Sequence, residues 1–268
     1  MSNKKLKAFL DKVEKEFGQE ALIIPALGFT LPNEDLEILS TGSRKIDKAL
    51  GIGGLPMGRI VEILGTESSG KTTLALSVVR EAQFKGYRCA YIDTEQALDK
   101  VRIKQIGVDF ENLAISQPNS AEEALDLLEI LVLSKLFKVI VLDSVASLVP
   151  KAEIEGDMSS ATIGLQARLM GKLLRKVVSP VNKNKVLLIF INQLRNKIGG
   201  FTPFPVEVGS GGNALKYYAS IRIDMRRTGM ARKGEPGSTH KVTIKKNKLA
   251  VPMKTTKIKI GEGGIYDE

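Results

Sequence analysis

The chain has 268 residues, of which 43% are hydrophobic, and it carries a formal net charge of +10. This length and composition are typical of one large α/β domain, and a single cysteine excludes a disulfide-stapled scaffold. The sequence contains no apolar run near the roughly 18 residues that a membrane span needs, and its start lacks the pattern of a signal peptide. We therefore expect a cytoplasmic protein.

The positive charge is concentrated near the end of the chain. Between Asn213 and Ile260 there are 13 lysine and arginine residues and two acids, so the rest is about neutral. A basic region of this kind suits a polyphosphate partner such as nucleic acid, although a solvated basic surface gives the same composition. Cys89 lies in an apolar stretch that predicts a buried strand, and the lone His240 is a poor candidate for a metal site.

In chain order, the first expected element is an amphipathic helix over residues 4–17, followed by a polar stretch, so that residues 1–35 can form an arm. Short apolar strands then alternate with helices, which indicates a mainly parallel sheet with helices on both faces. We expect strands at 60–64, 89–92, 139–142 and 186–191, and helices at 71–84, 121–134 and 162–178. Period-two patterns at 220–225, 241–245 and 255–260 predict antiparallel strands that close the sheet.

The strongest motif is a phosphate-binding loop, Gly65-Thr66-Glu67-Ser68-Ser69-Gly70-Lys71-Thr72, which matches G-x-x-x-x-G-K-[ST] in full. An expected strand leads into it and an expected helix leaves it, so backbone N–H groups and the helix N-terminus can hold phosphate oxygens. Lys71 is expected to reach the β- and γ-phosphates of ATP, and the Thr72 hydroxyl to coordinate Mg²⁺.

Two acids follow other expected strands. Asp143 ends the strand 139–142 and should lie beside the loop magnesium. Glu95 follows the strand 89–92 and is the candidate for positioning or deprotonating the attacking water. From the residues alone, Glu95 could equally be an acid at the start of a helix.

The sequence resembles the RecA recombinases of bacteria and phages from about Ile38 to Lys254. The stretches that carry the resemblance are LSTGS (39–43), GGLPMGRIVEI (53–63), PKAEIEG (150–156), LIFINQ (188–193) and GGNALKYYAS (211–220). The resemblance implies the fold of a RecA-like P-loop ATPase core. It also implies an N-terminal polymerisation arm at 1–35, a core at 36–268, and the absence of the family's usual small C-terminal domain.

The resemblance also assigns roles in the nucleotide site. Glu95 matches the catalytic carboxylate and Asp143 the magnesium-linked acid. Gln193, at the end of its expected strand, matches the sensor of the γ-phosphate, although a capping amide is the alternative. Lys246 and Lys248 match lysines that reach the ATP of the neighbouring subunit, although an ordinary basic hairpin would look the same. The nucleotide-binding set is completed by Thr73, Asp99 and Arg102.

By resemblance, two loops, at 155–163 and about 195–209, face the filament axis and hold DNA. Arginine, lysine and backbone N–H groups can bind phosphates, and apolar side chains can wedge between bases. Arg168 and Arg175 lie seven residues apart and so on one face of the expected helix, although each could be an ordinary solvated arginine. The expected DNA-binding residues are Ile163, Arg168, Arg175, Arg195, Lys197, Ile198, Phe201, Gly211, Gly212 and Asn213.

Three positions depart from the family pattern. Arg102 stands where an aromatic residue usually stacks on adenine, and Ile260 replaces a second aromatic near the nucleotide. An arginine plane can still stack on a base, so we expect weaker discrimination for adenine. The second loop contains Pro203 and Pro205 and is one residue longer than the bacterial pattern, which predicts a stiffer loop.

We therefore expect a DNA-dependent ATPase that forms a head-to-tail filament on single-stranded DNA and pairs it with homologous duplex DNA, in recombination, DNA repair and the SOS response to damage. ATP and Mg²⁺ are the expected cofactors, and a LexA-like repressor is a further possible partner. One alternative is a recombinase-like mediator that binds ATP and DNA but scarcely turns over. The other is a hexameric RecA-fold ATPase such as a helicase or a clock-type protein.

Overall fold

The computed structural model describes residues 3–18, 36–156, 164–196, 207–231 and 237–267. The chain divides into two compact units, Met1–Glu37 and Ile38–Glu268, which we describe separately. In the described part of the chain, no helix is long and apolar enough to cross a membrane.

The described part of the first unit is the helix α1 (Asn3–Phe17), which confirms the expected amphipathic helix and begins one residue earlier. Its Phe9 and Phe17 side chains are 54% and 73% exposed. Lys12 and Glu16 form an ion pair one turn apart at 4.0 Å on the polar side. The helix therefore presents apolar side chains that its own unit does not cover.

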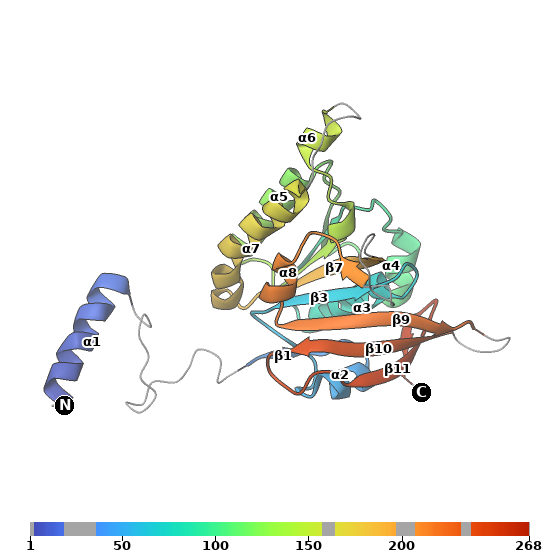
Figure 1. Ribbon diagram of the computed structural model, residues 1–268. Helices are drawn as coiled ribbons and strands as arrows, with labels where there is room; N and C mark the ends of the chain where they lie inside the picture. The colour runs from blue at the N-terminus through green and yellow to red at the C-terminus, as the bar shows by residue number, and fades with distance from the viewer. Residues whose placement is uncertain (1–2, 19–35, 157–163, 197–206, 232–236, 268) are drawn as a thin grey trace, which may run out of the picture. The chain divides into compact units, whose positions relative to one another are not determined.

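The second unit is built on one large sheet (Figure 1). In spatial order its strands are β12 (Gly264–Tyr266), β11 (Thr255–Gly261), β10 (Ser238–Asn247), β9 (Ile221–Gly229), β3 (Ile60–Gly65), β7 (Leu187–Asn196), β6 (Val139–Asp143), β4 (Cys89–Asp93) and β5 (Leu113–Ser116). β8 (Glu207–Gly209) pairs with the end of β7, and β1 (Ile38–Leu39) pairs with β2 (Leu55–Pro56) in a separate two-stranded sheet.

The sheet has a parallel part and an antiparallel part. The strands from β9 to β5 run parallel, whereas β9, β10, β11 and β12 pair antiparallel to one another. Because parallel strands end at the same edge, the loops that follow β3, β4, β6 and β7 gather at one side of the sheet. This edge is where the sequence places its phosphate loop and both acids.

Helices cover both faces of the sheet (Figure 1). Alternate residues of β3 belong to different cores: Val61 and Ile63 pack with α2 (Arg44–Leu50), α3 (Lys71–Phe84) and α4 (Lys100–Ile106). Ile60 packs on the other face with α5 (Ala121–Leu133) and α7 (Leu165–Lys183). The remaining short elements are η2 (Val145–Ser147), α6 (Lys151–Ile154) and α8 (Ala214–Tyr218).

The expected elements are confirmed with small changes at their ends. α3 has the bounds predicted for it, and Cys89 is a buried strand residue. The strand expected at 186–191 is longer, because β7 continues to Asn196 and its last residues pair with β8. β9 and β10 likewise extend beyond their predicted ends, because each is bonded to two neighbouring strands.

β3 also carries a buried charge. The side chain of Glu62 is 2% exposed, forms an ion pair with Arg222 on β9, and accepts a hydrogen bond of 2.9 Å from Asn192 Nδ2 on β7. Three neighbouring strands are therefore joined by one buried carboxylate, which is compensated by its ion pair and its hydrogen bond.

We expect Arg222→Met to lower the free energy of unfolding by about 3–5 kcal/mol, because Glu62 would keep a buried charge without its cation. Lys176→Met is the matched control. It breaks an ion pair with Glu129 between α7 and α5 in which the lysine is 50% exposed, and it should cost less than about 1 kcal/mol. Urea denaturation measures both losses, and equal losses would contradict the structural role of Glu62.

Candidate functional site

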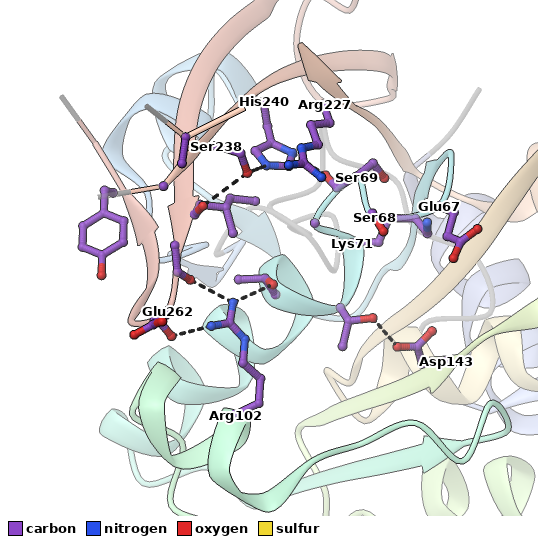
Figure 2. A pocket seen from close by; sticks show the side chains of 18 of the residues that line it. Glu67, Ser68, Ser69, Lys71, Arg102, Asp143, Arg227, Ser238, His240 and Glu262 are labelled. Carbon is purple, nitrogen blue, oxygen red and sulfur yellow. Dashed lines mark hydrogen bonds between the residues drawn. The ribbon is translucent and has the colours of Figure 1, made fainter. Parts of the chain in front are cut away.

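The phosphate-binding loop lies between β3 and α3 and lines a pocket of about 840 Å³ (Figure 2). Gly70 precedes α3 with a φ of 90°, and a Cβ there would lie 2.3 Å from Ile260 Cδ1, so the position requires glycine. Lys71 is buried and its Nζ donates to the Thr66 carbonyl at 2.7 Å. Burial lowers the pKa of Lys71, while nearby Asp143, Glu95 and Glu67 act in the opposite direction.

Thr72 and Asp143 form the expected pair for a metal ion. The Thr72 hydroxyl and the Tyr91 hydroxyl each donate to Asp143 Oδ2 at 2.7 Å. Burial is the main cause that raises the pKa of Asp143 to about 6, and the two hydroxyl donors oppose it. A hydroxyl and one carboxylate beside a phosphate loop are oxygen ligands of the kind that Mg²⁺ takes together with substrate phosphates.

The loop also has an unused polar atom. Ser69 Oγ is buried, and within the described residues it has no hydrogen-bond partner. An unpaired buried hydroxyl at a phosphate loop fits a site completed by a phosphate and its ion. In the described chain, no group of three or more His, Cys, Asp or Glu residues could hold a metal without such help.

Glu95 and Gln193 meet at the edge of the same pocket. Glu95 Oε1 accepts hydrogen bonds from Ser144 Oγ at 2.5 Å and from Gln193 Nε2 at 2.8 Å. Glu95 lies between β4 and α4, so its interpretation as an acid at a helix start is wrong. Gln193 lies inside β7, three residues before the strand ends, so it is neither a cap nor the last strand residue.

Arg102 lies on the far side of the pocket, where Figure 2 shows its guanidinium pointing toward the turn that contains Glu262. It donates to the carbonyls of Glu262 at 2.5 Å and Gly261 at 2.9 Å, which ties α4 to the turn between β11 and β12. Asp99 does not line the pocket; its side chain caps α4 by accepting from the Arg102 backbone N–H. A role for Asp99 in nucleotide binding stays a prediction.

The expected trans lysines are not brought to the pocket of their own chain. Lys246 Nζ donates to the carbonyls of Lys216 at 2.8 Å and Tyr217 at 3.1 Å, and neither Lys246 nor Lys248 lines the pocket. Burial, followed by repulsion from Lys248 and Arg222, lowers the pKa of Lys246. A role for Lys246 and Lys248 in the site of another molecule stays a prediction.

The described DNA-binding candidates lie on α7 and in the segment that follows β8. Arg168 and Arg175 are exposed on α7. Gly211 and Gly212 have φ values of 78° and 76°, and a Cβ at either would come within 2.7 Å of Val145 or Ala167, which explains both glycines. Asn213 follows them at the N-cap position of α8, where its side chain makes no capping bond. Ile163, Lys197, Ile198, Phe201 and the Arg195 side chain lie outside the described residues.

Asn192 on β7 joins the segment that follows β8 to the sheet. Its Oδ1 accepts from the Ser210 N–H and its Nδ2 donates to the Ser210 carbonyl, both at 3.1 Å. Asn192 and Gln193 are consecutive in β7, so their side chains point to opposite faces. β7 therefore binds Ser210 through Asn192 and contacts Glu95 in the pocket through the next residue, Gln193.

Sequence reasoning missed several residues of the site. Tyr91 and Ser144 hold the two acids, and Tyr266 and Arg227 line the pocket. The strand alternation around Asn192 could have shown that it faces away from Gln193. His240, considered only as a metal ligand, is 2% exposed in the pocket, and no local signal in the sequence indicated this.

We expect this pocket to bind GTP within about tenfold of ATP, because Arg102 and Ile260 replace the flat aromatic faces that hold adenine. Arg102→Tyr should strengthen the binding of both nucleotides, since stacking on an aromatic ring contributes about 1–3 kcal/mol per base whichever base it is. Competition of ATP and GTP against a fluorescent ADP measures the preference. Arg102→Ala controls for the lost bonds to Gly261 and Glu262, and a strong ATP preference in the unaltered chain would contradict the expectation.

Comparison with known proteins agrees with this geometry. The family model described as RecA N-terminal domain matches residues 4–265. The proteins named Protein RecA from Mannheimia haemolytica and Acidiphilium cryptum are 52% and 48% identical to this chain over 264 and 265 residues. The alignments cover 97% of this chain in each case, and 71% and 76% of the two relatives.

Proposed function

The chain belongs to the RecA family, and we propose that it is a DNA-dependent ATPase that forms a helical filament on single-stranded DNA and catalyses homologous pairing and strand exchange. The relatives named Protein RecA support a role in recombination and repair. The geometry of β7 supports the coupling of ATP binding to DNA binding. The cytoplasmic location and the LexA-like partner stay predictions.

The observation that carries the proposal is the pair Asn192 and Gln193. Gln193 is bonded to Glu95 at the place where a γ-phosphate would lie, and Asn192 holds Ser210, the residue before Gly211 and Gly212. A γ-phosphate that draws Gln193 away from Glu95 would act on β7. Asn192, the preceding residue of β7, fixes the proposed DNA-binding segment, so this segment would respond. Conversely, DNA bound at Gly211 and Gly212 would act on the same strand.

Different residues of the pocket would have different roles in hydrolysis. Glu95, exposed at the mouth of the pocket, would accept a proton from the attacking water, while Ser144 and Gln193 orient its carboxylate. Lys71 and the loop N–H groups would hold the phosphates. Mg²⁺, held by Thr72 and Asp143, would neutralise charge that develops on the phosphate oxygens.

Head-to-tail assembly of subunits would complete the nucleotide site. The exposed apolar residues of α1 suit docking on the core of another subunit, and the core itself exposes Ile130, Leu133 and Leu136 beside one another on and after α5. A head-to-tail contact of this kind generates a helix of subunits. Lys246 and Lys248 would then reach the γ-phosphate of the neighbouring subunit and stabilise its charge as an arginine finger does.

The decisive experiment is ATP hydrolysis with and without single-stranded DNA. We expect stimulation by DNA, and a fall of roughly 10²–10⁴-fold in Glu95→Gln because the general base is lost. Glu111→Gln is the matched control, since Glu111 is 74% exposed and does not line the pocket. Electron microscopy of the same samples would show filaments. Binding of DNA and ATP with no stimulated turnover would instead favour a mediator.

A second experiment tests the coupling through β7. Asn192→Leu keeps the side-chain shape but removes both bonds to Ser210 and the bond to Glu62, so we expect DNA-stimulated hydrolysis to fall about tenfold while affinity for ADP stays within about threefold. Asn112→Leu on the exposed surface is the control. Unchanged stimulation in Asn192→Leu would show that the Ser210 contact does not transmit the signal.

A further inference from the structure

His240 is the only histidine of the chain, and it lies against the phosphate-binding loop. It is near the start of β10, and Figure 2 shows its ring close to Ser69, with Ser238 and Arg227 nearby. Its Nδ1 is 2.9 Å from the Ser69 carbonyl oxygen and its Nε2 is 2.8 Å from Ser238 Oγ. The ring therefore has a protein partner at both nitrogens.

These partners fix the protons on the ring. A carbonyl oxygen can only accept, so Nδ1 must carry the hydrogen and donate it to Ser69. In the neutral ring, Nε2 then accepts from the Ser238 hydroxyl. Burial, with a smaller contribution from Arg227, lowers the pKa of His240, against the opposing effect of the Ser69 bond. At neutral pH the ring is thus an uncharged donor with one defined tautomer.

The bond to the Ser69 carbonyl also orients the Gly70 N–H, which belongs to the same peptide unit. The Ser69 carbonyl and the Gly70 N–H belong to the same trans peptide unit, in which the two groups point in opposite directions. Holding the carbonyl toward β10 therefore holds the Gly70 N–H away from β10. This N–H lies in the turn that enters α3, where backbone donors of a phosphate loop meet phosphate oxygens.

Local sterics do not fix this peptide. Gly70 has a φ of 90°, and a glycine can rotate its flanking peptides more freely than any other residue. Support must come from outside the loop, and the C-terminal strands supply it. A Cβ on Gly70 would lie 2.3 Å from Ile260 Cδ1 on β11 and 3.4 Å from Met225 Cε on β9, and His240 on β10 lies between these strands.

We propose that His240 is a positioning residue for phosphate binding, whose Nδ1–H bond to Ser69 directs the Gly70 N–H toward the phosphates of the bound nucleotide. The inference rests on the proposed nucleotide site and names a support for it on β10. The bond is the same before and during the chemical step. Its loss therefore weakens nucleotide binding while the rate at saturation is kept.

The test compares two substitutions of nearly equal shape. In His240→Asn the amide nitrogen takes the position of Nδ1 and still donates to Ser69, whereas His240→Leu places a methyl group there. We expect the dissociation constant for fluorescent ADP and the KM for ATP to rise about tenfold in His240→Leu, the loss of one oriented hydrogen bond. His240→Asn should stay within about threefold, with kcat at saturating ATP within about twofold in both.

Thr239→Val is the matched control, because Thr239 is the preceding residue of β10 and does not line the pocket. Its ADP affinity should not change. If His240→Leu fails to fold, His240→Ser replaces it, since a serine is too short to reach Ser69, and the same tenfold loss is expected.

The outcomes separate the two proposals. If the unaltered chain binds ADP and the donor-free variants bind it equally well, the positioning role is overturned while the nucleotide site stands. A loss in kcat with unchanged affinity, or an equal loss in His240→Asn and His240→Leu, also overturns it. If the unaltered chain binds no ADP, the proposed function itself fails.

Discussion

The period-two alternation of β7 is the constraint on which the described machinery depends. Consecutive residues of a paired strand point to opposite faces, and Asn192 and Gln193 are both paired with β3, so their side chains lie on opposite sides of the sheet. The register pairs Gln193 with Gly65, which places the Glu95 contact level with the start of the phosphate loop. Asn192 forms hydrogen bonds to both Ser210 and the buried Glu62. The residues expected at the nucleotide and those expected at DNA therefore meet on one strand.

Much of the fold and part of the site could be predicted because their signals are local. The loop from Gly65 to Thr72 lies between its strand and its helix in the sequence, so the position of Lys71 and Thr72 at the start of α3 follows from chain connectivity. Asp143 ends β6 and Glu95 follows β4 by two residues, and parallel strands bring their C-terminal ends together. The pairing of Thr72 with Asp143 is a direct consequence of this topology.

The rest could not be predicted because it depends on contacts between distant segments. Arg102 and Gly261 are 159 residues apart, and His240 and Ser69 are 171 apart, so no spacing rule connects them. Both contacts arise because the antiparallel strands fold back beside β3 and place β10 and β11 against the loop. The longer β7 has a similar cause: its last three residues pair with β8, a strand inside the segment expected as the second DNA loop, about 195–209.

β10 connects the two kinds of site that the family resemblance implies. At its start His240 supports the chain's own phosphate loop, and near its end Lys246 is directed away from that pocket. Six residues of strand separate them, a span of roughly 20 Å, and an even spacing would place both side chains on one face. The irregularity between Ile244 and Lys246 removes this constraint, since a bulge re-aims the side chains that follow it. The proposed support of the chain's own phosphate loop and the expected reach of Lys246 to a neighbouring subunit thus lie at opposite ends of one strand.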